Sequence, residues 1–80
     1  FLILTMRGNN GLHIACINGC DSVIKILINK GIYINSLDNE NKTPIHCACE
    51  NENEKSIEEL LKFEDIQLNI RDSYGFTPFA

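Results

Sequence analysis

The amino-acid sequence predicts an all-α solenoid, in which helix-turn-helix pairs stack on one another and are joined by extended, β-hairpin-like loops. The main observation is that the chain matches itself when it is shifted by 33 residues. Leu12-His13-Ile14-Ala15-Cys16 then lies over Ile45-His46-Cys47-Ala48-Cys49. Apolar residues also recur at helical spacing in both copies, and turn-forming residues follow each copy. Such a repeat buries its apolar face only by stacking on a neighbouring repeat, so a solenoid is expected.

The first helix of each copy is predicted from its N-terminal residues. Thr43 suits the N-cap, and Pro44 suits the first helical position because its missing N–H has no partner there and its φ is already helical. In the first copy Asn10 keeps the cap, whereas Gly11 is a poor helix former. We therefore expect a helix to begin at each pair, and the first one to fray more readily.

Apolar stripes predict the second helix of each copy. In the first copy the stripe consists of Val23, Ile24, Ile26, Leu27 and Ile28, and in the second copy of Ile57, Leu60 and Leu61. Gly31 supplies a left-handed residue that can end the first of these helices. No glycine follows the second stripe, so residues 63–65 must close that helix in another way.

The junction between the two helices differs between the copies. Gly19 stands there in the first copy, while the second copy has Asn51-Glu52-Asn53-Glu54 and no glycine. We therefore expect the second junction to be looser or shifted.

Extended arms and tight turns are predicted between the helix pairs. Residues 32–35 and 66–69 alternate or run apolar, and they lead into turn sequences at 38–41 and 72–75. Asn41 lies in the first turn and tolerates left-handed backbone better than most residues. The match in this part has an offset of 34, which indicates one inserted residue near Glu64-Asp65.

Together these motifs resemble the ankyrin repeat, a 33-residue unit with a Thr-Pro-Leu-His-x-Ala signature. The second copy has Thr43-Pro44-Ile45-His46-Cys47-Ala48, and the first keeps Leu12-His13-Ile14-Ala15. The resemblance implies one ankyrin-repeat domain over residues 1–80. Residues 1–4 would end a preceding repeat, 5–37 would form repeat 1, 38–71 repeat 2, and 72–80 the start of repeat 3. It also implies that His13 and His46 form hydrogen bonds in the turn network beside the threonine, and that further repeats occur in the full-length chain.

For function, the resemblance implies a protein-protein interaction module or scaffold with no catalytic residues and no cofactor. In the family, partner contacts cluster on the turn tips and on the outward end of the first helix, on the concave face. By register these positions are Met6, Arg7, Asn9, Ile17, Asn18, Asn39, Glu40, Lys42, Glu50, Asn51, Ser73, Tyr74 and Phe76. Tyr74 and Phe76 are the natural anchors, since aromatic side chains supply much of the energy at interfaces, although they could instead cover a following repeat.

Charge and composition exclude several other partners. The 11 acidic and 7 basic residues give a net charge of -4, which argues against nucleic acid and against an anionic membrane surface. Phe1–Leu4 is too short an apolar run to span a membrane, and no signal-peptide pattern is present. An intracellular, cytoplasmic location with reduced cysteines is therefore expected. The glutamates around residues 50–59 form either a solvated surface or a surface for basic partners.

Two alternative functions remain open from the sequence. One is a small metal-binding or thiol redox domain that would use Cys16, Cys20, Cys47, Cys49, His13 and His46. The spacing does not favour it, because no C-x2-C pair is present and Cys16 and Cys49 share a repeat position where the family has a small residue. The other is a structural segment of a long repeat array within a multidomain enzyme or channel.

Overall fold

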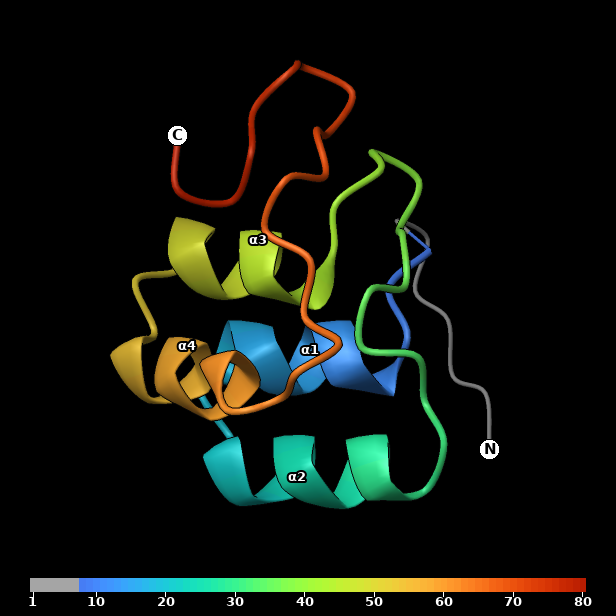
Figure 1. The fold of residues 1–80 in the computed structure, drawn as a ribbon, viewed down its shortest axis with the longest axis vertical. Helices are drawn as coiled ribbons and strands as arrows, with labels where there is room; N and C mark the ends of the chain where they lie inside the picture. The colour runs from blue at the N-terminus through green and yellow to red at the C-terminus, as the bar shows by residue number, and fades with distance from the viewer. Residues whose placement is uncertain (1–7) are drawn as a thin grey trace.

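The computed structural model describes residues 8–80 and contains four helices in that range, arranged as two pairs (Figure 1). These helices are α1 (Gly11–Asn18), α2 (Asp21–Asn29), α3 (Pro44–Glu50) and α4 (Glu54–Leu61). Helix α3 packs on α1, and α4 packs on α2, so the two pairs lie in register. No strand occurs among residues 8–80, and the segments after α2 and α4 are loops with tight turns. The predicted all-α repeat fold is confirmed, while the segment 1–4 assigned to a preceding repeat lies outside the described residues.

Helices α1 and α3 both begin with the predicted caps. Asn10 Oδ1 accepts hydrogen bonds from the backbone N–H groups of Leu12 and His13, at 2.9 and 3.2 Å. Thr43 Oγ1 accepts from the His46 N–H at 3.4 Å. Each histidine completes the cap in return, because its Nδ1 accepts the backbone N–H of the cap residue, at 3.2 Å in α1 and 3.1 Å in α3. The histidine thus takes the place that glutamate or glutamine usually has in a capping box.

Helix α2 ends as the sequence predicts. Gly31 has a φ of 104°, its N–H donates to the Ile28 carbonyl, and the Ile32 N–H donates to the Leu27 carbonyl at 3.2 Å. This pair of bonds is a Schellman motif, which requires the left-handed residue that glycine supplies without steric cost. Helix α4 lacks that glycine and closes with tighter three-residue turns, such as the bond from the Phe63 N–H to the Leu60 carbonyl at 3.2 Å.

The expectation of a looser or shifted junction between α3 and α4 is wrong. In the first copy Gly19 has a φ of 72°, and the next residue donates its N–H to the Ala15 carbonyl at 2.9 Å. In the second copy Glu52 has a φ of 54°, and the Asn53 N–H donates to the Ala48 carbonyl at 3.0 Å. The two turns therefore have the same geometry, and in the second a glutamate adopts the left-handed conformation.

A long-range contact explains why this turn forms without glycine. The side-chain Nδ2 of Asn53 donates to the carbonyls of Cys16 and Ile17, both at 2.7 Å. These carbonyls lie in the last turn of α1, where backbone acceptors have no partner within the helix. Repeat 2 therefore caps the end of α1, and this contact offsets the cost of the left-handed Glu52.

Glycine at position 52 is expected to stabilise the protein by about 1 kcal/mol, because a left-handed backbone costs about that much for a residue with a Cβ. The measurement is the urea denaturation of Glu52→Gly, monitored by circular dichroism. Asn51→Gly is the matched control and should be destabilising, since Asn51 has a φ of -93° and its side chain donates to the Cys47 carbonyl at 2.8 Å. Equal effects of both changes would show that the backbone conformation of Glu52 carries no strain.

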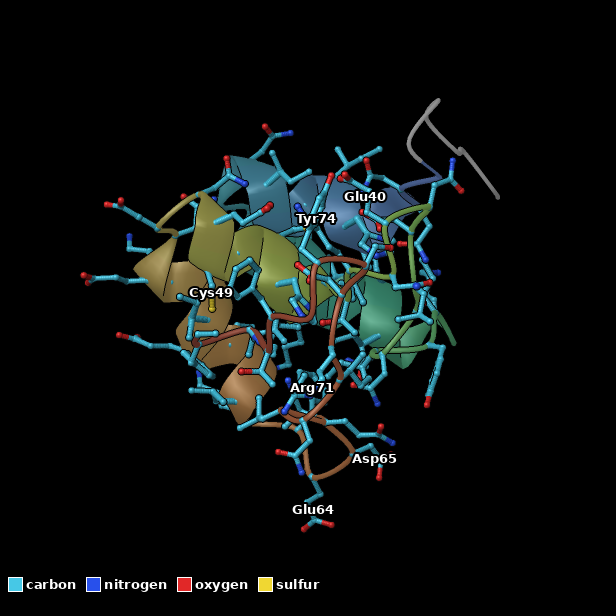
Figure 2. All side chains as sticks on the ribbon, turned by 90° about the horizontal axis from the view of Figure 1, so that it is seen from above. Glu40, Cys49, Glu64, Asp65, Arg71 and Tyr74 are labelled. Atoms are coloured by element: carbon cyan, nitrogen blue, oxygen red, sulfur yellow. The ribbon has the colours of Figure 1, made fainter. Side chains whose placement is uncertain are left out.

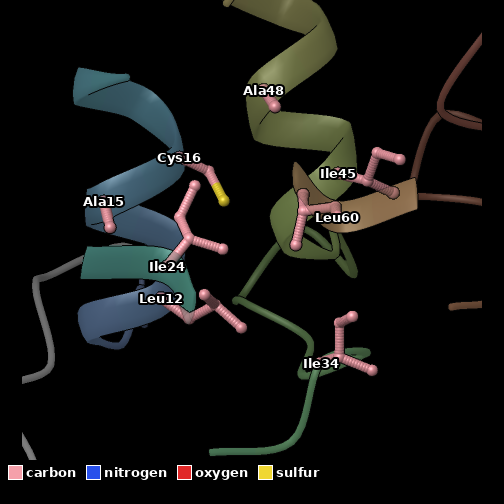
Figure 3. Packing of buried hydrophobic residues seen from close by; sticks show 8 residues of the cluster. All are labelled: Leu12, Ala15, Cys16, Ile24, Ile34, Ile45, Ala48 and Leu60. Atoms are coloured by element: carbon pink, nitrogen blue, oxygen red, sulfur yellow. The ribbon is translucent and has the colours of Figure 1, made fainter. Parts of the chain in front are cut away.

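The hydrophobic core lies between the two helix pairs (Figure 3). Its buried members come from both copies and from the loop after α2: Leu12, Ala15, Cys16, Ile24, Ile34, Ile45, Ala48 and Leu60. Ala15 and Ala48, which match in the sequence repeat, are both buried in it. The common environment of these matched residues shows that the sequence register is the structural register.

Other matched positions differ in burial, and the difference shows which side of each repeat is covered. Ile24 is fully buried, while its counterpart Ile57 is half-buried. The reverse holds for Leu60, which is fully buried, and its counterpart Leu27, which is half-buried. The side of each repeat that faces the other repeat is therefore buried. Within residues 8–80, the outer side of each repeat is only partly covered.

Candidate partner-binding surface

Two matching turns form the tips of the loops. In the first, the Asp38 N–H donates to the Lys42 carbonyl and the Asn41 N–H to the Asp38 carbonyl, both at 3.0 Å. Asp38 Oδ1 also accepts the N–H groups of Glu40 and Lys42, at 2.8 and 2.9 Å. The turn at 72–76 repeats all four contacts. Asn41 takes the left-handed position with a φ of 59°, a conformation that asparagine tolerates better than most residues.

Neighbouring tips are bonded to one another. The Ser73 N–H donates to the Glu40 carbonyl at 2.8 Å, and the Tyr74 hydroxyl donates to Glu40 Oε2 at 3.0 Å. Asn9 Nδ2, which precedes the first tip, donates in the opposite direction along the chain, to Asp38 Oδ2 at 3.2 Å. Figure 2, which looks down on the molecule from above, shows Tyr74 and Glu40 next to one another. The tips therefore form a continuous row rather than independent loops.

Lys42 lies at the centre of this row. Its Nζ is 2.7 and 2.6 Å from the two carboxylate oxygens of Glu50, 3.6 Å from Glu40, and 5.9 Å from the centre of the Tyr74 ring. The hydrogen bonds to Glu50 raise the pKa of Lys42, and the bond to Glu40 raises the pKa of Tyr74. Ion pairs this exposed add little stability, so their main effect here is to orient the side chains.

A groove of about 340 Å³ lies between α3 and the last turn. Its lining comes from the tips, from α3 and from the C-terminal residues, and includes Lys42, His46, Cys49, Glu50, Asp72, Tyr74, Phe76, Thr77, Pro78 and Ala80. Tyr74 and Phe76 are 66% and 57% exposed. Asp72 accepts the backbone N–H groups of Phe76 and Tyr74, which lower the pKa of its carboxyl, so it is charged at neutral pH.

Several predicted contact residues come together at this groove and its rim, namely Glu40, Lys42, Glu50, Ser73, Tyr74 and Phe76. Others do not belong to it. Asn9 is only 4% exposed and is bonded to Asp38. The remaining predicted positions lie elsewhere: Ile17 and Asn18 at the end of α1, Asn39 on the first tip, and Asn51 after α3. Met6 and Arg7 lie outside the described residues.

Asp72 and Cys49 line the groove although the sequence did not single them out as contact residues. The sequence did contain a pattern that points to Asp72, because this residue matches Asp38 in the repeat. That match predicted its role in the turn, but not that its carboxylate would line a groove.

The two histidines link successive repeats below the tips. Nε2 of His13 donates to the Lys42 carbonyl at 2.9 Å, and Nε2 of His46 donates to the Phe76 carbonyl at 3.0 Å. Since Nδ1 of each ring accepts a backbone N–H, the proton of the neutral ring must be on Nε2. The expectation that both histidines act within the turn network is confirmed, and both are held in a structural role.

Acidification below pH 6.5 is expected to destabilise the protein. Burial lowers the pKa of His13 below its ordinary value of 6.5, so the unfolded chain takes up a proton in this range that the folded chain does not. The stabilisation is therefore complete above pH 6.5 and is lost as the pH falls below it. Thermal melting across this range should show the loss, and His13→Gln should show a smaller pH dependence. An unchanged pH dependence in that variant would contradict the assignment to His13.

The cysteines show no arrangement suited to a metal ion or to redox chemistry. All four thiols are free, and within residues 8–80 no three His, Cys, Asp or Glu side chains gather as a metal site requires. Burial raises the pKa of the Cys16 thiol to about 12, and it also raises the pKa of Cys49. A reactive cysteine needs a thiolate and access to solvent, and Cys16 has neither.

The four cysteines are expected to differ in their rates of thiol labelling. With Ellman's reagent at pH 8, exposed Cys20 should react within seconds to minutes, while Cys16 should react only when the protein unfolds, because its thiol is buried and protonated. Cys20→Ser should remove the fast phase and leave the slow phases unchanged. Rapid labelling of Cys16 in the folded protein would instead indicate an accessible, activated thiol.

Comparisons with known proteins agree with this geometry. The family model for ankyrin repeats, in three copies, matches residues 2–79. Rabankyrin-5 from Homo sapiens is 38% identical over 73 residues, which cover 91% of this chain and 6% of that protein. Alpha-latrotoxin-Lh1a from Latrodectus hasselti is 33% identical over 73 residues, which cover 90% of this chain and 5% of that protein. A putative ankyrin repeat protein from Rickettsia bellii is 41% identical over 71 residues, which cover 84% of this chain and 30% of that protein.

The chain thus spans only a small part of the length of these relatives. None of the helices within residues 8–80 combines the length and the apolar character that crossing a membrane demands.

Proposed function

Because this chain belongs to the ankyrin-repeat family, we propose that it is a protein-binding module that holds a partner across its turn tips and the groove beneath them. Ankyrin repeats are generally protein-protein interaction modules. The observation that carries the proposal is the row of bonded tips beside a groove with two exposed aromatic side chains, Tyr74 and Phe76. Catalysis by the chain is not proposed, since ankyrin repeats are typically non-enzymatic.

The bonds between the tips prepare this surface for binding. Ser73 and Tyr74 are each tied to Glu40 of the preceding tip, and Lys42 is tied to Glu50 of α3. A surface that is ordered before binding loses less conformational entropy when a partner docks. The exposed rings can then contribute the contact area that aromatic residues supply at interfaces.

Selection of binders from a displayed peptide library, with the folded chain as bait, tests the proposal. We expect enriched peptides whose binding is weakened by Tyr74→Ala. Tyr33→Ala is the matched control, because Tyr33 is 61% exposed but lies outside the groove beside α3. Peptides that lose binding with the Tyr33 variant and not with the Tyr74 variant would place the interface elsewhere and contradict the proposal.

A second candidate is a structural segment within a long repeat array. It is favoured by the small part of each relative that the chain covers and by the half-buried Ile57 and exposed Leu61 on the side that repeat 2 leaves uncovered. In this function Tyr74 and Phe76 would pack against a following repeat. Hydrogen exchange and tyrosine fluorescence of the chain with its natural flanking sequence would distinguish the two functions, because only packing against a following repeat would bury Tyr74.

We also propose an intracellular, cytoplasmic location and the repeat bounds 5–37 and 38–71. The four free cysteines support the location, because reduced thiols persist in the cytosol. Both helix pairs fall within the proposed bounds. Microscopy of a fluorescent fusion of the full-length protein tests the location.

A further inference from the structure

We propose that the groove between α3 and the last turn binds an arginine side chain of an extended segment of the partner. This inference rests on the proposed function and adds the chemistry of the partner to it. Three observations at the groove support it: a cation already bound there, a carboxylate oxygen of Asp72 to which none of residues 8–80 donates, and two exposed aromatic rings.

The first observation is that this cluster already binds a cation of the chain itself. Both carboxylate oxygens of Glu50 bond to the Lys42 ammonium group, and the Tyr74 ring lies 5.9 Å from it. Carboxylates and aromatic faces both bind guanidinium and ammonium ions in proteins. The surface therefore has the chemistry that a basic side chain requires.

The second observation comes from comparing Asp72 with its counterpart Asp38. Asp38 uses Oδ1 for its own turn and Oδ2 for the side chain of Asn9 from the preceding tip. Asp72 likewise uses Oδ1 for its own turn, but no hydrogen bond to its Oδ2 occurs among residues 8–80. Lys42, which holds the repeat position of Asn9, is bonded to Glu50 instead. Asp72 thus presents a charged carboxylate oxygen, free to accept a hydrogen bond, at the wall of the groove.

The third observation is the balance of charge and apolar surface around the groove. Lys42 is matched by Glu50, and Asp72 and Glu40 remain as excess negative charge at the groove and its rim. Tyr74 and Phe76 provide exposed rings beside these carboxylates. Arginine suits this combination better than lysine, because its planar guanidinium stacks on aromatic rings while it donates to carboxylates from its edge.

The test uses peptides selected by display on the folded chain, and each enriched peptide is compared with a version in which citrulline replaces arginine. Citrulline has nearly the same shape without the charge. We expect arginine in the enriched peptides, about 10-fold weaker binding of the citrulline version, and a similar loss with Asp72→Asn. Fluorescence anisotropy measures the binding. Asp72→Asn keeps the Oδ1 acceptor of the turn, and circular dichroism confirms that the variant is folded.

Glu58→Gln is the matched control, since it removes one negative charge from an exposed position of α4 outside the groove, and it should leave binding unchanged. Equal binding of arginine and citrulline peptides that still depends on Tyr74 would overturn this inference and leave the proposed function standing. Equal losses of peptide binding with Glu58→Gln and Asp72→Asn would show that only the overall charge of the protein matters. This result would also overturn the inference. Failure to enrich any peptide would count against the proposed function, and with it against this inference.

Discussion

Replacing Leu60 by alanine is expected to lower the free energy of unfolding by about 2–5 kcal/mol. Leu60 is fully buried where α4 packs on the first helix pair, so its truncation leaves a cavity that the neighbouring Ile24 and Ile45 only partly fill. Native domains have a free energy of unfolding of about 5–15 kcal/mol, and a small domain lies near the lower end. The variant should therefore lose a large fraction of its stability. Urea denaturation monitored by circular dichroism measures the loss.

The matched control for this prediction is Leu27→Ala. Leu27 has the same residue type at the same repeat position, but it is only half-buried because no part of residues 8–80 covers it fully. We expect this change to cost less than half as much as Leu60→Ala. Similar losses for the two variants would contradict the burial pattern on which the stacking of the repeats is based.

Asn35→Ala is expected to cost about 2–3 kcal/mol, although the residue lies in a loop. Asn35 is 3% exposed, its Nδ2 donates to the Asp65 carbonyl at 2.9 Å, and its Oδ1 accepts the Gln67 N–H at 3.0 Å. These bonds hold the loop after α4 against the loop after α2. The alanine variant would leave both backbone groups without their partner in a part of the protein where water has limited access.

Asn69→Ala is the matched control. It tests whether the loss at Asn35 comes from the contact between the two loops or from removing an asparagine at this repeat position. Asn69 matches Asn35 in the sequence repeat but is exposed. Its replacement should change the stability by no more than about 0.5 kcal/mol in the same urea titration. A loss at Asn69 comparable to that at Asn35 would show that the effect is local and does not come from the contact between loops.

The helices were predictable because their signals are local in the sequence. Thr43 and Asn10 cap the helices that follow them, and Gly31 ends α2 through its left-handed backbone. Each of these contacts spans only a few residues. A sequence pattern can therefore reveal them without knowledge of the fold.

The wrong prediction, at the α3–α4 junction, came from a contact that is not local. Glycine was expected where Glu52 stands, but the bonds from Asn53 to the end of α1 hold the turn from a distance of 36 or 37 residues. Asn9 shows the same effect, since its position predicted an exposed tip residue, and a bond to Asp38 of the next tip buries it. Such contacts depend on how the repeats stack, which local propensity does not contain.

The groove was only partly predictable for a related reason. The register predicted Lys42, Glu50 and Tyr74 as contact residues, and in the structure their side chains lie close together. It could not show that Lys42 bonds to Glu50 rather than to Asp72, because that choice depends on the distance between a loop and a helix. For this reason only the structure shows that none of residues 8–80 donates to the second carboxylate oxygen of Asp72.

The histidine links have a consequence for the shape of a longer array. Each imidazole ring is fixed at Nδ1 to the start of its own repeat and at Nε2 to the loop that opens the next, with closely similar distances at both joints. A flat aromatic ring has a fixed length, so it acts as a spacer of constant size between consecutive units. The spacing between consecutive repeats at this layer is therefore set in part by the length of the imidazole ring, and substitutions on the exposed surface leave that length unchanged.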